Sequence, residues 1–251
     1  MAKNYTIAED FMLPSKGLVY QQRVNAHVKL RSMTTEHEMK RLAHSDRAYM
    51  NLCEIIDDCL VENPGISAYD MCLADYQFLL HRLRVVTYGS AYKLEFRCPY
   101  CKTTNLETVN LDELQVNYLD ADISDLLEFT LPRCGKKVKI CMQTPRMIDD
   151  VQAQTKERNR KSKSATGDSA FLFTLMNLIQ QVDGAALDVV MKERFVRELD
   201  MMDTNYIMKK AQKLVESFGI DTKITRECSL CGLDYTGSFR ITAEFFGPTI
   251  D

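Results

Sequence analysis

Apolar residues recur at every third or fourth position through much of the chain, which is the pattern of helices that bury one face. Three such helices are predicted before residue 90 and four more after residue 143. The predicted helices are, in order, one from Thr34 or Thr35 to about His44, one carrying Tyr49 to Leu60, one opened by Ser67 or Asp70 and closed at Tyr88, and then 144–155, 171–182, 187–198 and 203–217.

Strand-like alternation of apolar and polar residues predicts short antiparallel hairpins between these helices. Val24 to Leu30 is one strand of an N-terminal hairpin. Residues 127–131 and 137–142 form a second hairpin around a turn at Pro132. Two further alternating stretches, 92–111 and 222–246, each contain a pair of cysteines, and Phe239 to Phe246 is the expected last strand. The predicted fold class is therefore α+β, mostly helical with short hairpins.

Two cysteine pairs of identical spacing stand at the tips of the last two hairpins. The first is Cys98-Pro99-Tyr100-Cys101 and the second is Cys228-Ser229-Leu230-Cys231. Two intervening residues allow a tight turn to direct both sulfurs at one ion, and four thiolates make a closed tetrahedral zinc site with no open position for chemistry. The expected metal ligands are Cys98, Cys101, Cys228 and Cys231, which hold a structural Zn²⁺ in a zinc ribbon split by a long insertion.

The cysteine spacing leaves two alternatives. One Cys-x-x-Cys pair can be a redox dithiol, so the two pairs could be independent of each other. The separation of the pairs is also long for a zinc ribbon, which leaves room for Cys134 or Cys141 as ligands.

The split ribbon divides the chain into five parts. These are an extended N-terminal arm or hairpin at 1–31, a helical part at 32–90, the first half of the ribbon at 91–111, an insertion with a β-hairpin and helices at 112–221, and the second half of the ribbon at 222–251. A metal ion is expected to close the insertion at its base, which stabilises the fold because closing a long loop costs chain entropy.

Composition narrows the class of protein and its surroundings. The chain has 251 residues and a formal net charge of −3, which disfavours wholesale binding to nucleic acid or to an acidic membrane. No apolar run approaches the length of a transmembrane helix, and residues 1–10 lack the apolar core of a signal peptide. Nine cysteines in such a chain favour a reducing compartment.

The sequence contains no recognised catalytic motif. Its four histidines fall in no zinc-enzyme spacing, and neither a phosphate-binding loop nor a Gly-x-Ser-x-Gly turn occurs. His81 stands beside Arg82 on a predicted helix and is expected at the surface or at an interface. We therefore expect that the protein is not an enzyme.

A zinc-ribbon regulator that binds nucleic acid is the alternative function. Cations flank the predicted metal site, namely Lys93, Arg97, Lys102 and Arg226. A basic stretch at 156–167, expected to be a mobile loop or a frayed helix end, adds to them. A four-thiolate zinc site carries a charge of about −2, which gives the flanking cations a partner within the protein. Nucleic-acid binding is therefore disfavoured.

Two tripeptides give the chain a resemblance to a known family. Leu13-Pro14-Ser15 and Tyr88-Gly89-Ser90 recur in the baseplate hub-assembly proteins of T-even-type contractile-tailed bacteriophages, and the order of these tripeptides and the first cysteine pair also matches. The resemblance is best over about residues 67–105, weaker near residue 13, and does not extend over 105–220.

The resemblance implies a non-enzymatic protein that acts in the host cytoplasm during tail morphogenesis. It would help to build the central hub of the baseplate, either as a hub component that stays in the virion tail or as an assembly factor. Its partners would be other hub or tail proteins, through the N-terminal arm, the acidic loop at 112–125 and the basic loop at 156–167. Gly89 is expected to relieve the backbone between helix and hairpin, and Leu13-Pro14-Ser15 to dock on a partner or on the protein's own core. The oligomeric state is left open.

Overall fold

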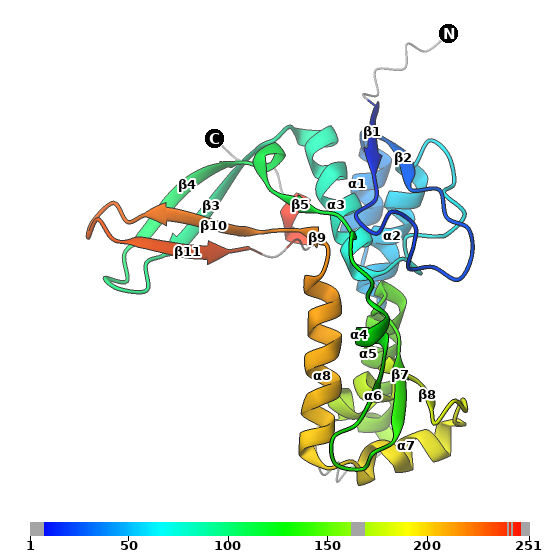
Figure 1. The fold of residues 1–251 in the computed structure, drawn as a ribbon. Helices are drawn as coiled ribbons and strands as arrows, with labels where there is room; N and C mark the ends of the chain where they lie inside the picture. The colour runs from blue at the N-terminus through cyan, green and yellow to red at the C-terminus, as the bar shows by residue number, and fades with distance from the viewer. Residues whose placement is uncertain (1–7, 162–168, 240, 242, 247–251) are drawn as a thin grey trace.

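Figure 1 shows two bodies and a projecting arm in the computed structural model, which describes residues 8–161, 169–239, 241 and 243–246. We call these parts the N-terminal body (8–90 with 241 and 243–246), the ribbon arm (91–110 with 223–238) and the helical lobe (123–216, without 162–168). In Figure 1 the arm extends to the left of the N-terminal body and the lobe lies below it. The described residues form eight α-helices and short antiparallel strands, as expected for a mixed α and β protein.

The N-terminal body is built around one buried helix. Its elements are β1 (Ala8–Met12), β2 (His27–Arg31), α1 (Thr35–Leu42), α2 (Ala48–Cys59) and α3 (Leu73–Tyr88). β1 and β2 form the expected N-terminal hairpin. Eleven of the sixteen residues of α3 are buried, so this helix lies inside the body. It begins later than predicted, because Ser67 and Asp70 close a turn in front of it, with the Asp70 N–H donating to the Ser67 carbonyl at 2.9 Å.

A buried carboxylate on α3 holds the Leu13-Pro14-Ser15 segment. Asp75 is fully buried and accepts hydrogen bonds from the Ser15 N–H at 2.9 Å and from the Ser15 hydroxyl at 2.5 Å. The Tyr20 hydroxyl donates to the same carboxylate at 2.6 Å. Burial raises the pKa of Asp75 above its usual value, and the hydrogen bonds from Ser15 and Tyr20 offset only part of this rise. The segment therefore docks on the protein's own core.

A buried guanidinium near the other end of α3 holds the Tyr88-Gly89-Ser90 segment. Arg84 is fully buried and donates to the carbonyl of Gly89 and to that of Phe245, each at 3.1 Å. The guanidinium also lies 4.8 Å from the centre of the Tyr88 ring. Gly89 has φ of +86°, a conformation that costs glycine little, and this allows the helix to end and β3 to begin.

The described residues of the predicted last strand, 239, 241 and 243–246, do not form a strand. The final strand ends at Ser238, and Ala243–Phe246 form a short 3-10 helix, η2. Successive side chains of a strand point to opposite faces, so a strand would leave Phe245 or Phe246 outside the core. In the turn of η2 both rings are buried, each 1% exposed, and they complete the core of the N-terminal body.

The ribbon arm consists of two hairpins packed against each other. Its strands are β3 (Ala91–Arg97), β4 (Thr104–Asn110), β10 (Lys223–Glu227) and β11 (Asp234–Ser238), with β3 paired to β4 and β10 to β11. Phe96, Val109, Ile224 and Tyr235 are buried between the hairpins. A Cβ atom on Gly237 would lie 2.4 Å from the Phe96 ring, so a larger residue there would push the hairpins apart.

The helical lobe has five helices and a three-stranded sheet of order β6-β7-β8, and α5 packs against α6 and against α2 of the N-terminal body. Its elements are α4 (Ser124–Leu127), β6 (Glu128–Thr130), β7 (Lys137–Ile140), α5 (Pro145–Lys161), α6 (Ser169–Leu178), β8 (Ile179–Val182), α7 (Val189–Glu198) and α8 (Met201–Glu216). The helix predicted over 171–182 was too long, because its β-branched end leaves the helix and pairs with β7. The basic stretch is helical as far as Lys161, and residues 162–168 lie outside the described residues.

Two very short strands close the insertion at its base. β5 (Val116–Asn117) pairs antiparallel with β9 (Gly219–Ile220), and η1 (Leu111–Glu113) precedes β5, so the 112–125 segment is less irregular than predicted. Gly219 has φ of +119°, and a Cβ atom there would lie 3.2 Å from the Cβ of Ala74 in α3. The expectation that a metal closes this base was therefore wrong, because the cysteines lie at the far end of the arm.

The helical lobe is bound to the N-terminal body through α5. Asp149 is fully buried and accepts hydrogen bonds from the N–H groups of Tyr49 and Met50 at 3.3 and 3.1 Å, in the first turn of α2. A carboxylate at this place satisfies free N–H groups and interacts favourably with the helix dipole. Arg146 adds a two-pronged ion pair with Asp70, at 2.6 and 2.7 Å.

We predict that Asp75→Ala lowers the free energy of unfolding by about 2–4 kcal/mol, because it leaves buried N–H and hydroxyl donors without an acceptor. Urea unfolding followed by circular dichroism measures the change. The matched control is Asp120→Ala, which removes a carboxylate that is 77% exposed and paired with Lys16, and this should cost less than about 1 kcal/mol. Equal losses in the two variants would contradict the proposed docking role of Asp75.

Candidate metal centre at the tip of the ribbon arm

The four cysteines of the two pairs converge at the tip of the ribbon arm. Their sulfur atoms all lie within 4.8 Å of one another, with Cys98 and Cys231 at 3.8 Å and Cys101 and Cys228 at 3.5 Å. Four sulfurs at Zn–S distances of about 2.3 Å form a tetrahedron with edges of about 3.8 Å. The observed separations are thus suited to a metal ion and far longer than a disulfide bond of about 2.05 Å.

Both cysteine turns have the same backbone geometry. The residue after the second cysteine lies in the left-handed region, Lys102 with φ of +65° and Gly232 with φ of +68°. Each donates its N–H to the carbonyl of the first cysteine, at 3.1 Å to Cys98 and 2.9 Å to Cys228. The two turns therefore present their sulfurs to a shared centre in the same way.

Backbone N–H groups favour the thiolate forms that metal binding requires. The N–H groups of Cys231 and Leu230 lower the pKa of Cys228 to about 6. The hydroxyl and N–H of Thr103 lower the pKa of Cys101. The Leu233 N–H also lowers the pKa of Cys231, but burial and the neighbouring sulfurs outweigh it and raise that pKa to about 12. The cluster therefore contains thiol protons, which a divalent cation would displace on binding.

Asn105 supports the cluster from the neighbouring hairpin and was missed by the sequence analysis. Its side chain is buried, and its Oδ1 accepts hydrogen bonds from the N–H and the hydroxyl of Ser229, at 3.0 and 2.7 Å. Its Nδ2 lies 3.7 Å from the sulfur of Cys228. A hydrogen-bonding group next to a ligating side chain orients that side chain. The inward position of Asn105, four residues before Val109 on β4, is the signal that could have identified it.

Cys134 and Cys141 are not part of this cluster. Both lie in the helical lobe, where the Cys134 N–H donates to Asp203 at 3.0 Å and the Cys141 sulfur lies 3.4 Å from the carbonyl oxygen of Leu178. The alternative in which either of them is a fourth ligand is therefore not supported by their placement.

His81 is fully buried, so the expectation of a surface or interface position was wrong. It lies on the inner side of α3, and its ring stacks on Phe245 with ring centres 6.2 Å apart. Burial, together with the neighbouring charge of Arg82, lowers the pKa of His81 to about 3. The imidazole is therefore neutral at pH 7 and packs as part of the core.

Cations near the cluster bind to groups of the arm itself. Lys102 donates to the carbonyl of Pro99 at 2.7 Å, and Arg97 donates to the carbonyl of Lys102 at 3.3 Å. Arg226 forms an ion pair with Glu107 at 3.6 Å.

The geometry described so far defines a two-bodied α and β protein with a closed four-cysteine cluster on a projecting arm. The sequence model of the family described as T4 bacteriophage base plate protein matches residues 6–247 of the chain. The protein belongs to this family and is a baseplate protein of the T4 type. Searches of curated proteins and of solved structures found no match. None of the described helices combines the length and hydrophobicity that crossing a membrane requires.

We predict that the purified protein contains about one zinc per chain and that Cys228→Ser loses it, because three thiolates and a hydroxyl bind zinc poorly. Elemental analysis gives the metal content, and thermal unfolding should show a lower Tm for the variant. Cys134→Ser, in the helical lobe, is the matched control and should keep both the metal and the Tm. Metal-free protein that unfolds at the same temperature as the purified form would contradict a stabilising role of the metal.

Proposed function

We propose that the four cysteines bind a structural Zn²⁺ and make the arm a zinc ribbon split between residues 91–110 and 223–238. The observation that carries this proposal is the convergence of Cys98, Cys101, Cys228 and Cys231, whose sulfurs all lie within 4.8 Å of one another and include two pairs at 3.5 and 3.8 Å. A set of four thiolates leaves no ligand position for water or substrate, which supports a structural role over a catalytic one.

The protein then acts in the assembly of the central hub of the baseplate, as a hub component or as an assembly factor. Membership of the baseplate family supports action in the phage tail. The finer assignment to the hub rests on the resemblance carried by Leu13-Pro14-Ser15 and Tyr88-Gly89-Ser90. Each of these segments is held by a buried charge of α3, Asp75 or Arg84, so their structural role is to fix the N-terminal body.

A non-enzymatic role is supported by what the buried charged groups do. Asp75, Arg84, Asp149 and Asp203 all bind backbone or hydroxyl groups of the chain itself. A catalytic acid or base must reach the proton that it transfers, whereas these buried groups are hydrogen-bonded to the chain itself. This use of the buried charges supports a protein that acts through contacts with other tail or baseplate proteins, in the host cytoplasm during assembly and, for a hub component, in the virion tail.

The alternative of a nucleic-acid-binding regulator gains no support from the basic stretch. Within the part of that stretch that the structure describes, Lys156 pairs with Asp46 at 3.2 Å and Arg158 with Glu193 at 3.1 Å. These cations are therefore partly neutralised within the protein.

We predict that tagged protein isolated from host cells late in infection carries hub proteins of the baseplate in stoichiometric amounts, as identified by mass spectrometry. The presence of the protein in mature particles identifies a component, and its absence identifies an assembly factor. Recovery of nucleic acid without tail proteins would contradict the proposal. In that case binding should weaken steeply with salt, because phosphate contacts release counterions.

A further inference from the structure

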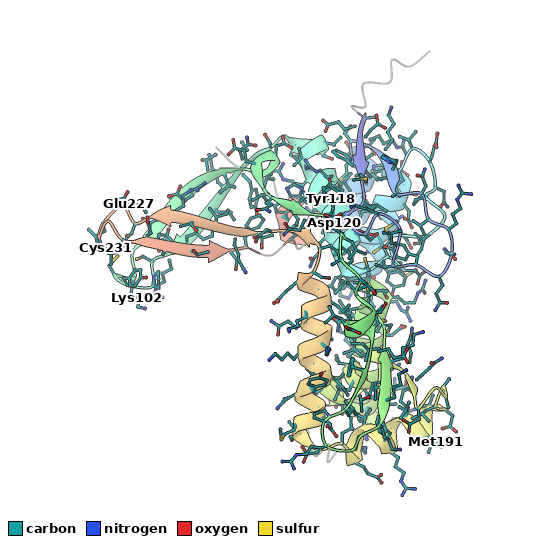
Figure 2. The ribbon with its side chains drawn as sticks, viewed as in Figure 1. Lys102, Tyr118, Asp120, Met191, Glu227 and Cys231 are labelled. Carbon is teal, nitrogen blue, oxygen red and sulfur yellow. The ribbon has the colours of Figure 1, made fainter. Side chains whose placement is uncertain are left out.

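The tip of the ribbon arm exposes large apolar side chains where the fold gives them nothing to pack against. Tyr100 and Leu230 are 61% and 70% exposed and occupy the same position in the two cysteine turns, directly before the second cysteine. Leu233, two residues after the second turn, is 50% exposed. Lys102, Glu227 and Cys231 mark this tip in Figure 2, at the end of the arm far from both the N-terminal body and the helical lobe.

Contacts between the two hairpins also support the tip. The buried contact of Gly237 with Phe96 and the hydrogen bonds of Asn105 to Ser229 join the two hairpins along and near the end of the arm. A rigid apolar surface binds a partner with little loss of conformational entropy, and a centrally placed tyrosine is a frequent energetic anchor of interfaces.

The charge of the tip indicates what kind of partner fits it. Residues 97–103 and 227–234 contain two cations, Arg97 and Lys102, and two carboxylates, Glu227 and Asp234, which sum to zero. Four thiolates around one divalent cation add a charge of about −2, so the metal-loaded tip is anionic. An anionic surface repels nucleic-acid phosphates and is complementary to a cationic protein surface.

From these features we infer that the tip of the ribbon arm is a docking surface for another protein of the baseplate, one that offers an apolar pocket rimmed by lysine or arginine. The side chains of Tyr100, Leu230 and Leu233 enter the pocket, and the cations of the partner face the cluster. This inference rests on the proposed zinc ribbon and adds to it the place and the chemistry of the contact. The metal then holds the two cysteine turns in the register that the pocket requires.

The experiment measures binding of the full-length, zinc-loaded protein to each purified protein of the same phage's baseplate, by biolayer interferometry. The test variant is Tyr100→Ser with Leu230→Ser. The control variant is Val189→Ser with Val190→Ser, which removes two side chains that are 73% and 79% exposed on α7 of the helical lobe. We expect at least one baseplate protein to bind, about tenfold more weakly to the tip variant and within about twofold of wild type to the control.

Charge reversal provides a second readout. Asp234→Lys should slow association with the same partner, and the effect should shrink as salt screens the interaction. Unchanged binding by the tip variant, an equal loss in the control, or no binding by any baseplate protein would overturn the inference. Self-association that the tip variant abolishes would overturn it in favour of a second copy of this chain.

Zinc analysis of all samples separates this result from the proposed function. Wild-type protein without zinc refutes the zinc ribbon, whereas zinc-containing variants that bind like wild type refute only the docking surface. Should the double variant lose zinc, Tyr100→Ser alone repeats the test with the second cysteine turn intact.

Discussion

Two opposite charges buried in one helix constrain most of the N-terminal body. A carboxylate or guanidinium removed from water must find hydrogen-bonding partners, because leaving it unpaired costs several kcal/mol. On α3, Asp75 accepts from Ser15 and Tyr20, and Arg84 donates from Nε and Nη1 to the carbonyls of Phe245 and Gly89, while its buried Nη2 has no hydrogen-bond partner among the described residues. The two charges therefore select one path for the chain before α3, after it and near residue 245. The apolar core alone is less specific, since its contacts have no direction.

The same solution recurs in the rest of the molecule. Asp149 receives N–H groups at the start of α2, and Asp203 in α8 receives those of Arg133 and Cys134 at the β6–β7 turn, at 2.8 and 3.0 Å. For Asp203, burial opposes ionisation, but the two N–H groups outweigh it and lower the pKa. Asp149 joins α5 to residues 99 and 100 positions earlier in the sequence, and Asp203 joins α8 to residues 69 and 70 positions earlier. In the ribbon arm, the four-cysteine cluster likewise brings together two hairpins that are distant in sequence.

The sequence was informative where a local rule applies. Identical Cys-x-x-Cys spacing predicted that the four sulfurs converge, and helical periodicity placed most helices within a few residues. It failed where a distant neighbour decides the outcome. β8 is a strand because it pairs with the edge of β7, and η2 forms where its two rings fill the space between α3 and the arm. The role of Asn105 depends on its hydrogen bond with Ser229. The inward orientation of His81 likewise depends on how α3 packs, which the identity of its neighbour Arg82 does not reveal.

The aromatic pair in η2 has a consequence for biosynthesis. Phe245 and Phe246 enter a core whose other buried residues lie between Leu13 and Leu111, apart from Ile241, and Arg84 has one of its two carbonyl partners at Phe245. When synthesis has reached residue 240, the N-terminal body therefore still lacks these two rings. Apolar surface that they cover later, and part of the Arg84 guanidinium, are then still in contact with water. Contacts between segments so far apart in sequence form late and slowly. Incomplete chains would therefore expose apolar surface that the completed N-terminal body buries.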